Sequence, residues 1–575
     1  MPIHYPHPVK DLVDVAAGRK EPDFVVSGEV FSVFTGECFE ADVAVYNGYI
    51  AGVGDYSCDV VYETEYILPG FIDAHVHIES TLLHPAEFAR AVLKHGTTAV
   101  VADPHEIANV CGKQGIKFMI EATANLPVDF YFMAPSCVPA VEGLESFGFR
   151  LEVGDVREVL GYDRVIGLAE VMNYPGVVNG DVSMLSKIEL ALESGKAVDG
   201  HCPGIEGKAL NAYLAAGIST DHESTRLEEV MEKLRRGMKI MLREGSVARN
   251  LKDLSKAVSP YTLSSLMIVC DDLLPEDLMR GHMDERLRRA VRYGIRAEDA
   301  VRMVTINPAT HYSLNCGAIA PGCIADIVSV SGFDDFDVRL VVKRGNVVWD
   351  GEYRCDFPKL PLEKAPESVR NSFRMREITL DDLKIPAEGK VCRLIRPVEG
   401  QIITKSGEYE PPVKDGFAMP DPESGVSKVI VIDRHRAEKF VGKAFVEFGM
   451  EKGAMASSVS HDSHNCICVG VDDSDMLRAI NAVKEMGGGF AASAEGKVKT
   501  LPLPIAGLMS DLPYEEVVRR MESLSKMLRE MGVKAEHPFI EISFFALPVI
   551  PELRVTDFGL VDVVNMKLVD LWIEA

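Results

Sequence analysis

The sequence predicts an α/β protein built on a (β/α)8 barrel, with a small β-domain that the barrel splits in two and an additional C-terminal α+β domain. Strand-like apolar runs alternate with helical patterns over a central block of roughly 240 residues, a length that suits such a barrel. Strand-rich stretches of similar texture flank this block on both sides. A doubly wound open sheet is the alternative, and no GxGxxG motif follows the first strand to favour it.

The flanking stretches are expected to form one small β-domain from two separate segments. Residues 24–54 alternate short apolar runs with turn residues, as antiparallel strands do. The same alternation recurs at residues 317–351. Neither stretch has enough strands to bury a sheet face alone. We therefore assign residues 1–68 and 311–355 to one domain.

The central block, residues 69–310, is expected to form the barrel. Helical patterns such as LEEVMEKLRRGM, with apolar residues three and four positions apart, lie between several apolar runs. The runs that indicate strands include TTAVVAD, RVIGLAE, AVDGH, GISTDH, IMLREGS and LMIVCDD. This alternation predicts parallel strands joined by helices.

The remaining chain divides into a connector and a C-terminal domain. Residues 356–390 contain several prolines and charges and little periodicity, so we assign them to the connector. Residues 391–575 form the α+β domain, in which SKVIVID, NCICVGV and FIEISFFA indicate strands. Helices are expected near residues 474–486 and 514–531.

Composition and charge narrow the class of protein. Of the 575 residues 47% are hydrophobic and 26% charged, which is typical of a globular protein. The 61 Lys and Arg against 87 Asp and Glu give a formal net charge of −26, which disfavours nucleic-acid polymers and anionic membranes as partners. Twelve cysteines without a CxxC pair favour a reduced, cytoplasmic location. The N-terminal segment MPIHYPHPVKDLVDVAAGRK has no apolar signal-peptide core, and no run of 18 apolar residues predicts a membrane span.

The densest chemical signal is LPGFIDAHVHIES, residues 68–80. Because side chains alternate along a strand, His75 and His77 point the same way. At the C-terminal end of a barrel strand, this pair can offer two imidazoles to one metal ion.

Further polar residues follow the apolar runs of the same block, where a barrel places its catalytic groups. They are Asp103, His105, Glu106, Glu170, His201, His222, Asp271 and Asp272. With the first pair, five of the chain's 15 histidines fall at predicted strand ends, more than chance placement explains. Imidazole and carboxylate together suit zinc, manganese or iron better than calcium.

A second polar motif, SHDSHN at residues 460–465, lies in the C-terminal domain. One hypothesis is a loop that reaches the barrel mouth, where His461 and His464 close over a substrate or contribute a ligand. The other is a polar hydrogen-bond cluster between domains. The sequence leaves both open.

These motifs together resemble a known family. LPGFIDAHVHIEST and the split β-domain resemble the amidohydrolase superfamily of metal-dependent hydrolase barrels. The combination of HVHIES, ADPHEIANV, GLAEVMNYPGV, STDHES and SVSHDSHN is similar to the microbial adenine deaminases, from about residue 20 to the C-terminus. The resemblance therefore implies hydrolytic deamination of adenine to hypoxanthine and ammonia, in purine salvage, by a metal-bound hydroxide.

The resemblance also implies two divalent metal ions per chain, Mn²⁺ or Fe²⁺ rather than Zn²⁺. One ion would be held by His75, His77 and Asp271, and the other by His201 and His222. Many relatives bridge the two ions with a carbamylated lysine, whereas this chain has Glu170 at that place and its nearest lysine, Lys187, in a predicted helix. This departure favours the adenine deaminase branch over dihydroorotase or hydantoinase types.

Catalytic and substrate-binding roles follow from the same resemblance. Asp271 would take the proton of the attacking water, and Glu79 or Glu106 would protonate the ring. We expect Glu79 to share a strand face with His77, two residues away. The substrate-binding residues would be Ser80, Asp103, His105, His461 and His464. The implied partners are adenine and further copies of the chain, in a dimer or larger homo-oligomer.

Two other functions stay open. A cyclic-amide hydrolase of the dihydroorotase or hydantoinase type could use the same barrel. A non-catalytic, amidohydrolase-like interaction protein is the alternative from another class, but such relatives typically lose metal ligands and this chain has every expected position.

Overall fold

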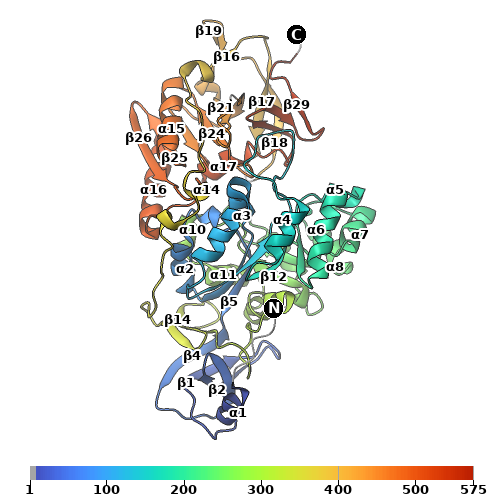
Figure 1. The fold of residues 1–575 in the computed structure, drawn as a ribbon, viewed down its shortest axis with the longest axis vertical. Helices are drawn as coiled ribbons and strands as arrows, with labels where there is room; N and C mark the ends of the chain where they lie inside the picture. The colour runs from blue at the N-terminus through green and yellow to red at the C-terminus, as the bar shows by residue number, and fades with distance from the viewer. Residues whose placement is uncertain (1–7, 399–400, 439, 574–575) are drawn as a thin grey trace.

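The computed structural model describes residues 8–398, 401–438 and 440–573. Figure 1 shows three parts along the long axis, with the strands β1 and β2 at one end, the barrel in the middle and the C-terminal domain at the other end. The N-terminal segment that argued against secretion begins in residues 1–7, which lie outside the described residues. None of the described helices is long and apolar enough to cross a membrane.

Residues 71–269, all of them described, contribute the parallel strands of the barrel. The strands are β5 (Phe71–Val76), β6 (Thr97–Ala102), β7 (Asp129–Ala134), β8 (Val165–Val171), β9 (Ala197–Gly200), β10 (Thr220–Asp221), β11 (Lys239–Arg243) and β12 (Leu266–Val269). β5 to β9 pair in sequence order, as do β10 to β12. The amide of Ser219 bonds the carbonyl of Val198 at 3.0 Å beside the junction of these two sheets. β12 meets β5 through the amide of Asp271, which bonds the carbonyl of His75 at 2.9 Å. The predicted barrel is confirmed.

Helices follow most of the barrel strands and cover them from outside (Figure 1). They include α2 (Pro85–Leu93), α3 (His105–Ala122), α4 (Val153–Leu160), α6 (Val182–Glu193), α7 (Gly207–Ala215), α8 (Leu227–Arg235), α11 (Met283–Arg292) and α12 (Ala297–Met303). The interior is filled by side chains such as Ile72, Val101, Met133, Ile166 and Met267, all buried. The barrel interior is therefore a packed core, and the polar groups available for chemistry lie at the ends of the strands.

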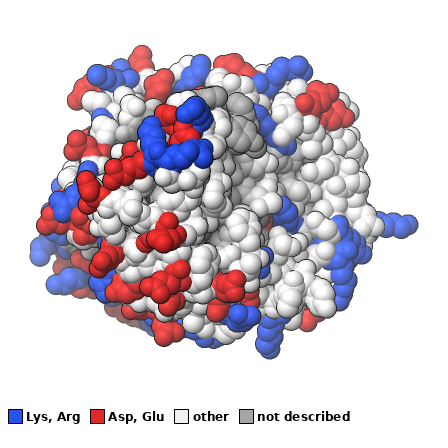
Figure 2. Space-filling model, turned by 90° about the horizontal axis from the view of Figure 1, so that it is seen from below, with Lys and Arg blue, Asp and Glu red and all other residues white. Residues whose placement is uncertain are grey.

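The two strand-rich stretches share one sheet. The first contributes β1 (Phe24–Phe31), β2 (Cys38–Tyr46), β3 (Tyr49–Gly54) and β4 (Val61–Pro69), and the second β13 (Ile327–Val330), β14 (Val338–Lys343) and β15 (Asn346–Trp349). β13 pairs antiparallel with β4, with Ile327 opposite Pro69. The residues before and after the barrel therefore pair as the sequence predicted, while the domain boundaries themselves stay a prediction. Figure 2 views this end and shows acidic and basic side chains interspersed on it.

The C-terminal domain is built on a mixed sheet whose described strands run in the order β18-β17-β22-β21-β24-β23-β25-β26. Their bounds are β17 (Cys392–Pro397), β18 (Thr404–Tyr409), β21 (Val426–Ile432), β22 (Val441–Glu447), β23 (Ala454–Ser457), β24 (Cys466–Gly470), β25 (Gly489–Ala494) and β26 (Lys497–Pro502). The helices α15 (Asp473–Glu485) and α16 (Tyr514–Glu530) pack on it, close to the positions expected. The connector holds α14 (Glu367–Arg370), which contacts α3 of the barrel.

One element of this domain was predicted wrongly. FIEISFFA was expected to be a strand, but it lies mostly in the helix α17 (Pro538–Phe544). A continuous apolar run does not distinguish a buried strand from a buried helix by its periodicity. The deciding local signal is Pro538, which occupies the first helical turn, where its fixed φ and missing N–H are tolerated.

Candidate active site

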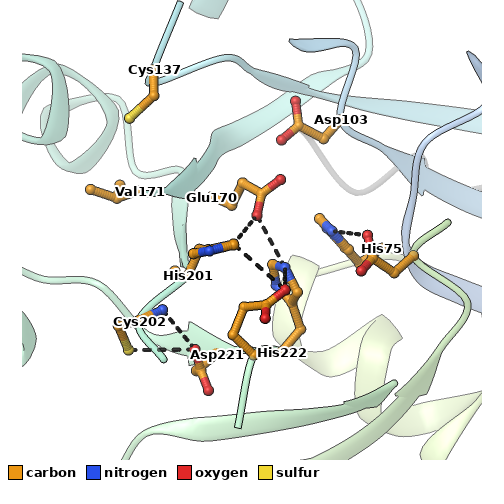
Figure 3. Close-up of polar contacts among 12 residues, drawn as sticks. His75, Asp103, Cys137, Glu170, Val171, His201, Cys202, Asp221 and His222 are labelled. Atoms are coloured by element: carbon orange, nitrogen blue, oxygen red, sulfur yellow. Dashed lines mark hydrogen bonds and ion pairs between the residues drawn. The ribbon is translucent and has the colours of Figure 1, made fainter. Parts of the chain in front are cut away.

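The polar residues predicted at the strand ends meet at one end of the barrel. The histidine and carboxylate side chains of this cluster are buried, except that Asp272 is partly buried and the His201 side chain is 25% exposed. His75 and Glu170 are the next-to-last residues of β5 and β8, and the others follow β5, β6, β9, β10 and β12. Figure 3 shows Glu170 between the side chains of His201 and His222, with His75 nearby.

Irregular pairing in two strands aims the key side chains inward. On β5, Asp73 pairs with Val100 and Val76 with Ala102, so three residues of β5 match two of β6. Regular alternation would place His75 on the outer face with Asp73, but this β-bulge brings it to the inner side. A similar register shift on β8 lies between Leu168 and Val171, around Glu170.

One group of donor atoms surrounds Asp271. Its Oδ1 lies 3.0 Å from Nε2 of His77 and 3.4 Å from Nε2 of His75. The ring of His75 stacks on that of His222, with centroids 4.3 Å apart. Asp271 rather than Asp272 therefore faces the histidines, because Asp272 accepts a hydrogen bond from Ser80 Oγ at 2.5 Å. Asp271 has a φ of 60°, a strained conformation for a non-glycine residue that is found preferentially at functional sites.

A second group surrounds Glu170. Its Oε2 lies 2.8 Å from His201 Nδ1 and 3.0 Å from His222 Nε2, and its Oε1 lies 3.5 Å from His105 Nδ1 and 3.6 Å from His77 Nε2. Burial alone would raise the pKa of Glu170, but the charges of His222 and His201 hold it well below its usual range. Each carboxylate oxygen thus faces a different pair of imidazoles, which is the geometry that a bridging ligand requires.

The donor atoms fit divalent transition metals. Nδ1 of His77 lies 3.1 Å from the carbonyl oxygen of Asp103, which only accepts, so Nδ1 carries a proton and Nε2 is the nitrogen available to a metal ion. Nε2 of His75 is buried without a hydrogen-bond partner. Nitrogen and carboxylate oxygen donors at these separations can hold Mn²⁺, Fe²⁺ or Zn²⁺. The groups that could do so include His75, His222 and Asp271; Glu170, His201 and His222; His77, Asp103, His105 and Glu170; and Glu106, His461 and His464.

Asp103 and His105 lie closer to these donors than the sequence suggested. The His105 ring centroid is 4.7 Å from that of His77, and its Nδ1 is 3.1 Å from Asp103 Oδ2. Both were predicted to bind substrate. Their contacts place them beside Glu170, where they could also act as ligands.

Two charged residues of the site escaped the sequence analysis. Arg243, at the end of β11, donates to Asp271 Oδ2 at 2.7 Å and contacts both carboxylate oxygens of Glu223. Arg243 therefore binds Oδ2 of Asp271, the oxygen that does not face the histidines. The available signals were Arg243 in the strand-end motif IMLREGS and Glu223 directly after His222.

The C-terminal domain reaches the site through the loop between β23 and β24. His461 Nδ1 lies 2.7 Å from Glu106 Oε1, and His464 contacts the other oxygen of the same carboxylate. The ring of His461 stacks on Phe544 of α17, with centroids 5.2 Å apart. The motif SHDSHN is therefore both at the barrel mouth and part of a polar contact between domains.

Glu79 is placed differently from the prediction. β5 ends at Val76, and Glu79 lies in the short 3₁₀ helix η1 (Glu79–Thr81) instead of continuing the strand face of His77. Its Oε1 accepts a hydrogen bond from the amide of Ile107 at 3.1 Å, while its Oε2 is buried without a partner. Burial raises the pKa of this carboxyl to about 7, and neighbouring Glu106 adds to the shift.

Comparison with known proteins identifies the family. The Amidohydrolase family model matches residues 66–348, and the Adenine deaminase C-terminal domain model matches residues 401–567. Adenine deaminase 2 of Carboxydothermus hydrogenoformans is 45% identical over 570 residues, covering 98% of this chain and 99% of that protein. Adenine deaminase of Methanothrix thermoacetophila is 44% identical over 573 residues, covering 98% and 100%. The chain belongs to the adenine deaminase family.

In this adenine deaminase family member, Lys187 supports Glu170 without replacing it. Lys187 lies in α6, as predicted, and its Nζ donates to the carbonyl of Ser136 at 2.8 Å. The Ser136 hydroxyl in turn donates to the backbone carbonyl of Glu170 at 2.6 Å. The lysine is therefore linked to the Glu170 backbone only through Ser136, and the Glu170 carboxylate faces the histidines.

A buried ion pair holds the two loops that carry His201 and His222. Lys233 and Asp221 are both fully buried, 2.9 Å apart, and Asp221 Oδ1 accepts from the amide of Cys202 at 2.9 Å (Figure 3). Lys233 Nζ also donates to the carbonyl of Cys202 and to Glu229, each at 2.8 Å. Cys202 follows His201 and Asp221 precedes His222, so one cation positions both imidazoles.

Replacing Lys233 by Met is expected to lower the free energy of unfolding by about 3–5 kcal/mol, because two carboxylates stay buried without their cation. The measurement is chemical denaturation, together with metal content per chain. Lys208→Met, at an exposed lysine of α7, is the matched control and should change neither. A Lys233→Met protein as stable and metal-rich as the wild type would contradict this role.

Proposed function

We propose that this chain converts adenine and water to hypoxanthine and ammonia with two divalent metal ions, as part of purine salvage in the cytoplasm. The observation that carries the proposal is Glu170, whose two oxygens face four imidazoles within 3.6 Å. The names of the relatives, matched over nearly the whole chain, support adenine as the substrate. All twelve cysteines are described and free, as in a reducing compartment.

The proposed ligands divide into two sets that share Glu170. His75, His77 and Asp271 would hold one ion, and His201 and His222 the other. When bound, such ions lower the pKa of water from about 15.7 to about 7, which makes hydroxide available at neutral pH. The proposed ligands are imidazoles and carboxylates without a thiolate, so Mn²⁺ or Fe²⁺ suits them as well as Zn²⁺ does, and the resemblance to the adenine deaminases favours Mn²⁺ or Fe²⁺.

The remaining chemistry is proton transfer by carboxylates of the site. The water oxygen bonds to C6 of adenine, and Asp271 accepts the water proton. Glu79 or Glu106 donates a proton to a ring nitrogen as negative charge develops on the ring. Asp271 then passes the water proton to the amino nitrogen, the C6–N bond breaks to release ammonia, and the C6 hydroxyl returns its proton to the glutamate as it becomes the carbonyl of hypoxanthine. Arg243 holds Asp271 in place for this step through its 2.7 Å contact.

We propose that the substrate binds between the barrel and the loop of the C-terminal domain. Its surroundings would be Ser80, Asp103, His105, His461 and His464. Their hydroxyl, carboxylate and imidazole groups offer the donors and acceptors that the edges of a purine need. We also expect a homo-oligomer, a dimer or larger.

The substrate assignment predicts ammonia release from adenine. The purified protein, loaded in turn with manganese, iron or zinc, is assayed with adenine, adenosine, dihydroorotate and hydantoin. Adenine should be turned over fastest, with hypoxanthine as product, and manganese or iron should support more activity than zinc. Ring opening of dihydroorotate or hydantoin without adenine turnover would favour the cyclic-amide hydrolase instead. No turnover of any substrate at full metal loading would favour the non-catalytic alternative.

The bridging role of Glu170 predicts a stoichiometry close to two transition-metal ions per chain. Elemental analysis of protein produced with ample metal measures it. His201→Asn and His222→Asn should each reduce the content toward one, because they remove ligands of one ion only. A wild-type protein that saturates at a single ion would refute the bridge.

Glu79→Gln should lower kcat by about 10²–10⁴-fold with metal content unchanged, because the amide keeps the shape and loses the proton. The position motivates this choice: Glu79 Oε2 is buried and free of hydrogen bonds beside the site. Asp271→Asn is expected to lose both activity and metal. Glu106→Gln is the comparison variant, and loss of activity there with near-normal activity in Glu79→Gln would transfer the role to Glu106. Metal loss in Glu79→Gln would make Glu79 a ligand.

A further inference from the structure

A pocket lies between the barrel and the C-terminal domain, beside the candidate site. Its empty volume is about 470 Å³, including the part open to solvent, and Ser80 and His461 lie among its lining residues. Ser80 is bonded to Asp272, and His461 to Glu106, so these two residues mark the inner end. At the other end the side chain of Glu536 is 74% exposed.

The walls of this pocket come from both domains and are mostly apolar. The barrel contributes Leu82 and Leu274, the latter next to α10 (Pro275–Leu278). The C-terminal domain contributes Phe539 and Ile540 of α17 and Met521 of α16. α10 contacts α16, and Figure 1 shows both where the two parts of the molecule meet.

We propose that this pocket is the entrance through which neutral purine bases reach the site and through which phosphorylated purines are kept out. This inference rests on the proposed deamination of adenine. An uncharged planar base loses little free energy when it leaves water for apolar walls, whereas a phosphate group loses much. The ionisable lining residues besides His461 are Glu276, Glu536 and His537, and no Lys or Arg lines the pocket to attract an anion.

The test places a reversible plug in the entrance. Ser525, on α16, lines the pocket and is half-buried, whereas Ser523 of the same helix does not line it. Ser525→Cys is treated with a neutral benzyl methanethiolsulfonate, which adds a benzyl group through a disulfide that dithiothreitol removes. Ser523→Cys and the wild type receive the same treatment. The half-buried native cysteines, which could also react, belong to the segments around the small β-domain: Cys38, Cys58, Cys323 and Cys355.

Modification of Ser525→Cys should lower kcat/KM for adenine about tenfold or more, because association slows when access narrows. Dithiothreitol should restore it, metal content should stay constant, and excess hypoxanthine should slow the labelling. Ser525→Phe, a permanent plug, should show the same loss. AMP should be a far poorer substrate than adenine for the untreated protein.

Each contrary result has one meaning. A thiol that is not labelled, or one that is labelled without loss of kcat/KM, would overturn the entrance. Full activity of Ser525→Phe would do the same. If the untreated wild type does not deaminate adenine at all, the proposed function fails, and labelling protected by adenine still reports whether a purine enters the pocket.

Discussion

The site depends on how the negative charge of a buried carboxylate, that of Glu170, is balanced by its neighbours. Glu170 lies at the end of a barrel strand with four imidazoles within 3.6 Å and no lysine or arginine among these contacts. A buried anion is costly unless cations or hydrogen-bond donors face it. Imidazoles serve this purpose only when they are protonated or when they share a cation with the carboxylate. The proposed divalent ions would satisfy the histidines and the carboxylates at once, which would account for so many polar groups being buried together here.

The surrounding backbone is arranged to bring those groups to one place. The bulge on β5 turns His75 inward. Asp271, which follows the neighbouring strand β12, lies beside His75 with a left-handed φ. Both features cost free energy locally and persist because the neighbouring structure determines them. Around this shell, Arg243 holds Asp271, and Lys233 with Asp221 holds the loops of His201 and His222. The proposed metal ligands are therefore positioned by charges that lie outside the proposed ligand set.

The sequence predicted the barrel and the identity of the polar cluster because both depend on short-range patterns. An apolar run followed by His, Asp or Glu marks a strand end wherever the strand lies in space, so His75, Glu170 and His222 could be found. Arg243, Glu223 and Lys233 were missed because arginine, glutamate and lysine are usual at surfaces, and only tertiary packing buries these three. The helix α17 was missed because its apolar run has no clear period, and Glu79 because the end of β5 is set by tertiary pairing.

The position of the C-terminal domain follows from the same electrostatic constraint. Glu106 begins α3 at the barrel mouth, and its carboxylate is buried. Of the imidazoles that compensate it, His105 is 3.5 Å away within the barrel, whereas His461 and His464 come from the loop after β23. Without that loop, Glu106 would face the site with one imidazole, His105, at 3.5 Å. The barrel alone is therefore electrostatically incomplete at its mouth. This accounts for a domain more than three hundred residues away in sequence from β5 being packed against the end of the barrel that carries the polar cluster.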